Sequence, residues 1–180
     1  MIMDKKKINI IIGIVACIVV IGCFVATSSI KKDGTGVTTG NDAEEMTQRA
    51  EKEAAAVKDE ERREFAKAEN VDHYLNLYNA TDKKRLVLLA SPTCGYCQIA
   101  APILENIAYE YDIKIYYLDS SAFSGDDQTK FISSNEAFAS GFGTPMLLLV
   151  SEGKIHDSVD GLVDRAGYIE FFKKHGYINE

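Results

Sequence analysis

Two cysteines separated by two residues are the part of this sequence best suited to chemistry. Cys94 and Cys97 enclose Gly95 and Tyr96 in the run Ser-Pro-Thr-Cys-Gly-Tyr-Cys. The thiolate is the reactive form of cysteine, and two sulfurs at this spacing can reach disulfide distance across one helical turn. A mixed disulfide formed by one sulfur can then be displaced by the other. The spacing therefore predicts thiol-disulfide exchange, with a structural pair or half of a metal site as the alternative.

Other residues of the kinds that bind metals do not extend this site. Cys17 and Cys23 are six positions apart in an apolar run, whereas a zinc ribbon needs two converging pairs with the shorter spacing. Three histidines are scattered, without metal-ligand spacing, and we assign them no role: His73, His156 and His175. We predict no metal and no bound cofactor.

The segments on either side of the cysteines predict a strand, a turn and a helix. Residues 85–90 (RLVLLA) form a short continuous apolar run, which is typical of a strand buried on both faces. Residues 98–109 return to helical spacing. Because backbone N–H groups at a helix N-terminus stabilise negative charge, we expect an acidified, exposed Cys94 and a shielded Cys97 one turn further on. Cys94 is thus predicted to attack and Cys97 to resolve.

Landmarks further along the chain have the order found in the thioredoxin superfamily, which residues 70–180 resemble. They are a proline inside the helix after the cysteines, a strand at 113–118, a Gly-Thr-Pro loop and strand at 143–150, a turn at Gly153, and a last amphipathic helix after Gly161. The resemblance implies an α/β fold with a central mixed sheet flanked by helices. It also implies a cis bond before Pro145 and strand-like pairing of Thr144 with a bound substrate peptide.

Several residues depart from the thioredoxin pattern. Thioredoxins have Trp before the first cysteine and Gly-Pro inside the motif, where this chain has Thr93 and Gly95-Tyr96. Cys-Gly-Tyr-Cys, with Thr before the proline, is similar to the bacterial periplasmic disulfide isomerases, so the direction of electron transfer stays open. Leu88 stands six residues before Cys94, where thioredoxins carry a buried Asp that relays a proton. Residues 126–138 predict an enlarged helix. Tyr96, inside the motif, is either a substrate contact or an ordinary loop residue.

The N-terminal residues predict a membrane anchor. Residues 8–30 carry no charge and are long enough to cross a bilayer. Three lysines precede the run and two follow it, which favours a cytoplasmic N-terminus and an extracytoplasmic remainder. We therefore predict a short cytoplasmic tip and a single-pass transmembrane signal anchor within residues 1–30. The alternative is a lipoprotein anchored at Cys23, because Val-Ile-Gly-Cys fits a loose lipobox.

Residues 31–69 predict a connection between the anchor and the globular domain. Glycine and small polar residues up to Gly40 are typical of a flexible linker, and the Ala, Glu, Lys and Arg content from there to Asn70 favours a helix. Its thin apolar stripe, which includes Met46, Ala50 and Ala54, suits a solvated, charged stalk better than a coiled-coil seam.

The formal net charge of −7 argues against nucleic acid as a partner, because such partners require a concentrated basic face. Together these features predict an extracytoplasmic thiol-disulfide oxidoreductase, attached to the cell membrane, that acts on cysteine-containing secreted or surface proteins and exchanges electrons with a redox partner protein. The alternative is a non-catalytic tethered accessory or binding module, such as a chaperone for exported peptides.

Overall fold

The computed structural model describes residues 40–179 of the chain. The predicted membrane anchor and flexible linker, and with them Cys17 and Cys23, lie outside the described residues. Within residues 40–179 no helix has the length and apolar character needed to cross a membrane.

A five-stranded mixed sheet forms the centre of the domain, with strand order β1-β3-β2-β4-β5. The strands are β1 (Ala66–Ala68), β2 (Arg85–Ala90), β3 (Ile115–Asp119), β4 (Met146–Ser151) and β5 (Lys154–Asp160). The central strand β2 pairs in parallel with β3 and antiparallel with β4. Leu86 to Ala90 are all buried, as the continuous apolar run predicts.

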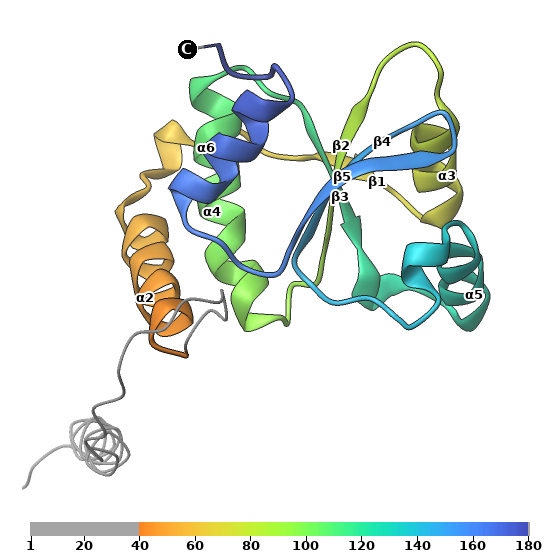
Figure 1. Cartoon of the computed structure of the whole chain (residues 1–180), viewed down its shortest axis with the longest axis horizontal. Helices are drawn as coiled ribbons and strands as arrows, with labels where there is room; N and C mark the ends of the chain where they lie inside the picture. Colours follow the sequence, from red (N-terminus) through yellow and green to blue (C-terminus); the bar gives the residue numbers. More distant parts are fainter. Residues whose placement is uncertain (1–39, 180) are drawn as a thin grey trace, which may run out of the picture. The chain divides into compact units, whose positions relative to one another are not determined.

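Helices cover both faces of this sheet (Figure 1). α4 (Gly95–Glu110) and α6 (Arg165–Lys174) lie on one face, and α3 (Val71–Asn79) and α5 (Gly125–Ser133) lie on the other. Short 3-10 turns complete the described elements: η1 (Asp59–Glu61), η2 (Ser120–Ala122) and η3 (Glu136–Phe138). The predicted α/β architecture, a mixed sheet flanked by helices, is confirmed.

Alternate residues of the sheet contribute to two apolar cores. Leu86 and Leu88 belong to the core under α4 and α6, whereas Val87 and Leu89 belong to the core under α3 and α5. Both faces of the strand are therefore covered, since successive side chains of a strand point to opposite faces. Pro102 lies inside α4, as the resemblance to thioredoxins implies.

The predicted helix at 126–138 is divided in the structure. α5 ends at Ser133, and η3 begins after Asn135, whose side chain accepts a hydrogen bond from the N–H of Ala137. The break lets Phe131 and Phe138 stack with their ring centroids 4.5 Å apart. Residue spacing alone indicates one continuous helix, but the structure has two shorter elements whose phenylalanine rings pack together.

The structure differs from the predicted stalk, because residues 40–68 contribute elements to the domain. α2 (Gly40–Ala56) is a helix as expected, but it ends well before Asn70, and β1 then pairs with β3 at the edge of the sheet. Ala50 is completely buried in the core under α4, and Figure 1 shows α2 beside that helix. The predicted domain boundary at residue 70 is therefore too late. The small side chain of Ala50 allows close contact between the two helices, so the thin apolar stripe faces the chain's own domain.

Polar contacts fix α2 to the start of α6. The Nη1 of Arg49 lies 2.9 Å from the Oδ2 of Asp164, which is the N-cap residue of α6. The Glu53 carboxylate accepts a hydrogen bond of 2.7 Å from the N–H of Arg165. Negative charge at a helix N-terminus is stabilising, and here α2 supplies part of it.

Candidate active site

Cys94 lies at the turn between β2 and α4, as the sequence predicts. It is the N-cap residue of α4, and its sulfur accepts a hydrogen bond of 3.2 Å from the N–H of Cys97. Cys94 is partly exposed, Cys97 is buried, and both are free thiols. A sulfur at a helix N-cap faces unpaired N–H donors, which is the environment that stabilises a thiolate.

The loop between η3 and β4 brings a second segment to Cys94. The bond between Thr144 and Pro145 is cis, which confirms that implication of the resemblance. The Cys94 thiol donates to the backbone oxygen of Thr144 at 3.5 Å. On the other side of this loop, the N–H of Gly161 donates to the Pro145 oxygen at 2.8 Å. The structure therefore places the backbone oxygen of Thr144, and the cis bond that follows it, beside the Cys94 sulfur.

The pKa values of the two thiols are shifted in opposite directions. Partial burial alone would raise the pKa of Cys94, but hydrogen bonds from the side chains of Cys97 and Thr144, and from the N–H groups of Cys97 and Tyr96, lower it below the ordinary value. Burial raises the pKa of Cys97, and the hydrogen bond with Cys94 raises it further. At a given pH the thiolate is thus concentrated on the more accessible sulfur.

Leu88 and Tyr117 contribute to the core that contains Cys97. Leu88 is 1% exposed and belongs to the same core as Cys97, and it lies in register with Tyr117 on β3. Burial, followed by the nearby charges of Asp119, Cys97 and Cys94, raises the pKa of Tyr117 to about 12. The Tyr117 hydroxyl is therefore neutral at physiological pH and does not substitute for a carboxylate as a base. Local spacing gives no sign of Tyr117, because its position beside Leu88 follows from strand register.

Solved structures of thioredoxins resemble this arrangement of strands and helices. No protein-family model matches the chain. Among solved structures, the thioredoxin from Trypanosoma brucei brucei has a TM-score of 0.50 at 17% identity, over 65% of this chain and 95% of its own length. Thioredoxin f2 from Chlamydomonas reinhardtii also has a TM-score of 0.50, at 14% identity, over 64% of this chain and 100% of its own. The chain has the thioredoxin fold. At these identities the likeness establishes the fold, and the chemistry has to be argued from the dithiol itself.

On this thioredoxin fold, Tyr96 projects from the first turn of α4 and is 57% exposed. It borders a hollow of about 310 Å³ that is also lined by Gly95, Ile99 and Glu51. Glu51 comes from α2, which the sequence analysis treated as a stalk. The alanines at 50 and 54 were the available sign that this helix packs against another surface.

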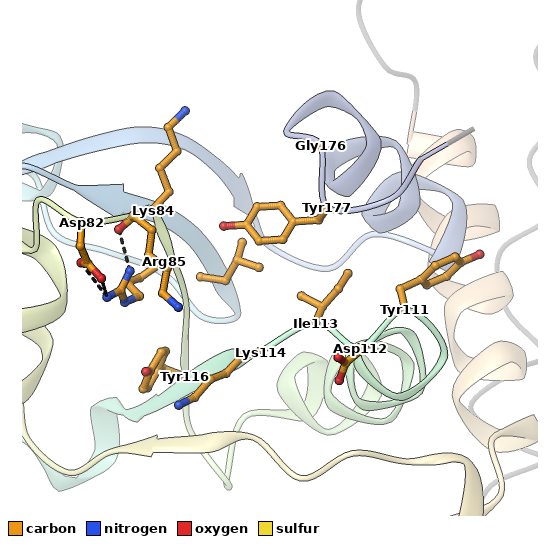
Figure 2. Close-up of a pocket in the computed structure, with 12 residues that line it drawn as sticks. Asp82, Lys84, Arg85, Tyr111, Asp112, Ile113, Lys114, Tyr116, Gly176 and Tyr177 are labelled. Atoms are coloured by element: carbon orange, nitrogen blue, oxygen red, sulfur yellow. Dashed lines mark hydrogen bonds and ion pairs between the residues drawn. The ribbon is translucent and has the colours of Figure 1, made fainter.

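A second hollow lies at the opposite end of the thioredoxin fold (Figure 2). It measures about 420 Å³ and is lined by residues at the start of β2 and around the turn into β3, including Lys84, Arg85 and Lys114. Arg85 binds both oxygens of Asp82 at 2.8 and 2.9 Å, and the Lys114 ammonium lies 4.6 Å from the centre of the Tyr116 ring. Cys94 follows the other end of β2, so this basic hollow is separate from the dithiol.

The histidines lie away from the dithiol. His156 shares a hydrogen bond of 2.7 Å with Ser151 between β5 and β4, and His175 shares one of 2.6 Å with Asp157. His73, in α3, packs against the ring of Tyr116. Within residues 40–179 no group of three His, Cys, Asp or Glu side chains is arranged to hold a metal ion.

Proposed function

We propose that this protein is a thiol-disulfide oxidoreductase in which Cys94 attacks and Cys97 resolves. The observation that carries the proposal is the N-cap position of Cys94, where its sulfur accepts the Cys97 N–H and faces the oxygen of Thr144. This position combines a lowered thiol pKa with access for a second sulfur. A purely structural pair would need neither property.

The reaction balances without a cofactor. The Cys94 thiolate attacks one sulfur of a substrate disulfide, and the other substrate sulfur leaves as a thiolate and takes a proton from water. Cys97 then loses its proton and attacks the sulfur of Cys94, which releases the second substrate thiol. The substrate gains two electrons and two protons, and Cys94 and Cys97 become a disulfide. The same steps in reverse oxidise a substrate dithiol, and attack without resolution by Cys97 allows isomerisation.

Thr144 and Pro145 are the proposed contacts for the substrate backbone. An extended peptide can pair with the main chain of Thr144, while Pro145 has no N–H group to compete for the attacking sulfur. Tyr96 is the proposed side-chain contact on the other side of Cys94, because its exposed ring belongs to the same turn.

The proposed substrates are cysteine-containing secreted or surface proteins, and a separate redox protein would restore the dithiol or the disulfide. This part of the proposal rests on residues 8–30, whose length and flanking lysines suit a single-pass anchor with the domain outside the cytoplasm. Lipid attachment at Cys23 would place the domain in the same compartment.

Single substitutions of the two cysteines test the proposed roles. We expect the full chain with Cys97→Ser to accumulate mixed disulfides with substrates, since Cys94 can still attack but nothing resolves the product. We expect Cys94→Ser to accumulate almost none. Non-reducing gels of cells that express each variant, repeated after addition of a reductant, provide the measurement.

Two results would count against the proposal. Equal trapping by both variants would remove the assignment of attacking and resolving roles. Absence of trapping by either variant, together with no exchange between the purified protein and a model disulfide, would favour the non-catalytic accessory module.

A further inference from the structure

The hollow beside Tyr96 lies one residue from the attacking cysteine and is formed by two helices. α4 contributes Gly95, Tyr96 and Ile99, and α2 contributes Glu51. Ala50, the neighbour of Glu51, is completely buried in the core that includes α4, so the α2 side of the hollow is held in place. Because Gly95 directly follows Cys94, the hollow adjoins the position at which a substrate cysteine would meet the Cys94 sulfur.

The chemistry of the lining differs between its base and its rim. Ile99 and the ring of Tyr96 offer apolar surface, and the Glu51 carboxylate is exposed at the edge. Within the part of the chain that the structure describes, Glu51 forms no ion pair or hydrogen bond through its side chain. Residues three and four positions away on α2 are the helix neighbours able to pair with it, and all four are uncharged: Thr47, Gln48, Ala54 and Ala55.

Two basic residues of α2 flank Glu51 in sequence, Arg49 and Lys52, but residues one or two positions apart on a helix do not face each other, and Arg49 is paired with Glu45 and Asp164. The other segments around the dithiol lack positive charge. Residues 90–99, 119–124, 141–146 and 158–163 contain no Lys or Arg but contain Asp119 and Asp160. Asp160 lies in register with Met146 and precedes Gly161, which binds the Pro145 oxygen. By contrast, Lys84 and Lys114 lie in the hollow at the far end of the sheet (Figure 2). A substrate that approaches Cys94 therefore meets carboxylates but no basic side chain in these segments.

We propose that the hollow receives a lysine or arginine side chain next to the reacting cysteine, so that the preferred substrates are basic cysteine-containing polypeptides. The aliphatic stem of such a side chain covers Ile99, and its charged end lies between the Tyr96 ring and the Glu51 carboxylate. The inference rests on the proposed function, because it assigns a preference to the same dithiol. It adds Glu51 as a specificity residue that touches substrate but takes no part in electron transfer.

Model peptides that differ in one position test this preference. Disulfide-linked peptides carry Arg, Gln or Glu beside the cysteine, and the rate of exchange with the reduced full chain is measured under single-turnover conditions. We expect the Arg peptide to react about five-fold faster than the Gln peptide at low salt, the size typical of an exposed ion pair with a cation–π contact. We expect the Glu peptide to be the slowest, and the differences to shrink in high salt.

Charge reversal identifies the residue responsible. Glu51→Lys should invert the order, so that the Glu peptide becomes the fastest. Glu60→Lys is the matched control, because Glu60 is an exposed glutamate of η1, whose Glu61 oxygen accepts a hydrogen bond from Asn106 in the second half of α4. That variant has the same change in net charge and should keep the original order.

The outcomes separate this inference from the function on which it rests. Equal rates for the three peptides, with exchange intact, would overturn the preference and leave the oxidoreductase in place. A preference that survives Glu51→Lys and disappears in Asp160→Asn would overturn the assignment to the hollow. Failure of every peptide to exchange, without trapping by Cys97→Ser, would instead remove the proposed function.

Discussion

Cys94 and Cys97 are chemically identical residues three positions apart, and their environments make them different. Cys94 is at the helix N-cap, where N–H groups point at its sulfur, while Cys97 is 5% exposed and faces the core. Hydrogen bonding to a thiolate lowers the thiol pKa and burial raises it, so the pKa values of Cys94 and Cys97 differ. This separation defines which sulfur a substrate meets and which one waits for the second step.

The lowered pKa of Cys94 predicts a distinct pH profile for alkylation. Iodoacetamide should alkylate Cys94 of the folded protein at half its maximal rate at a lower pH than in urea. In urea the unfolded thiol has its ordinary pKa of about 8.5. Because the folded pKa is the lower one, the corresponding stabilisation is fully present above the ordinary pKa and is lost as pH falls through the folded value. Peptide mapping by mass spectrometry resolves the individual cysteines. Identical profiles for Cys94 in the folded and unfolded chain would contradict the role of the helix N-terminus.

Leu88 gives a second prediction at this scale. Leu88 is buried in the core that contains Cys97, and we expect the carboxyl of Leu88→Asp to accept the Cys97 proton. We expect faster disulfide reduction in a turbidity assay, and a loss of about 1–3 kcal/mol in the free energy of unfolding from burial of the carboxyl. Both effects should appear together. If the folded variant reduces disulfides no faster at any pH between about 6 and 9, the range around the model thiol pKa, resolution by Cys97 is not limiting.

At the scale of elements, α2 contributes to the surroundings of the dithiol. It packs through Ala50 on α4, it binds the first residues of α6 through Arg49 and Glu53, and it brings Glu51 beside Tyr96. A helix that leaves the domain as a stalk would make none of these contacts. The position of α2 therefore bears on stability and on the shape of the site.

Substitutions on two faces of α2 test whether its packing stabilises the domain. Ala50→Arg forces a long side chain into a fully buried position and should lower the free energy of unfolding by about 1–3 kcal/mol. Ala55→Arg, on the exposed face of the same helix, should change it by no more than about 0.5 kcal/mol. Urea denaturation of the full chain measures both. Equal unfolding midpoints for the two variants would mean that the contact between α2 and α4 contributes little.

At the scale of the whole molecule, the proposed location depends on residues 1–39, and the proposed chemistry depends on the described domain. Residues 8–30 are uncharged and of spanning length, so we expect the dithiol to be outside the cytoplasm. Protease added to intact cells should then remove the domain, as followed by an antibody against it. Resistance until the cells are lysed would contradict this topology, and metabolic labelling of Cys23 with fatty acid would replace the anchor with a lipoprotein.

The strand, turn and helix around Cys94 could be predicted from the sequence because each is a local feature. The apolar run of β2, the helical spacing of α4 and the N-cap position between them depend on residues within about one helix length of one another. The order of later landmarks, with Thr144-Pro145 before β4, then indicated the fold. The N–H groups of Tyr96 and Cys97, which help to lower the pKa of Cys94, belong to the same local geometry, whereas the contribution of Thr144 does not.

Only the tertiary structure decided which distant residues surround the dithiol. The three residues of β1 are too few to produce a periodic signal, and their pairing with β3 depends on the register of the sheet. The thin alanine stripe of α2 favours a solvated stalk over a coiled coil but does not exclude packing on another helix, since a short side chain gains little from burial and loses little from exposure. The contact with α4 selects one of these possibilities, and with it the position of Glu51. Local patterns therefore determine the reacting sulfurs, whereas long-range packing determines what a substrate meets beside them.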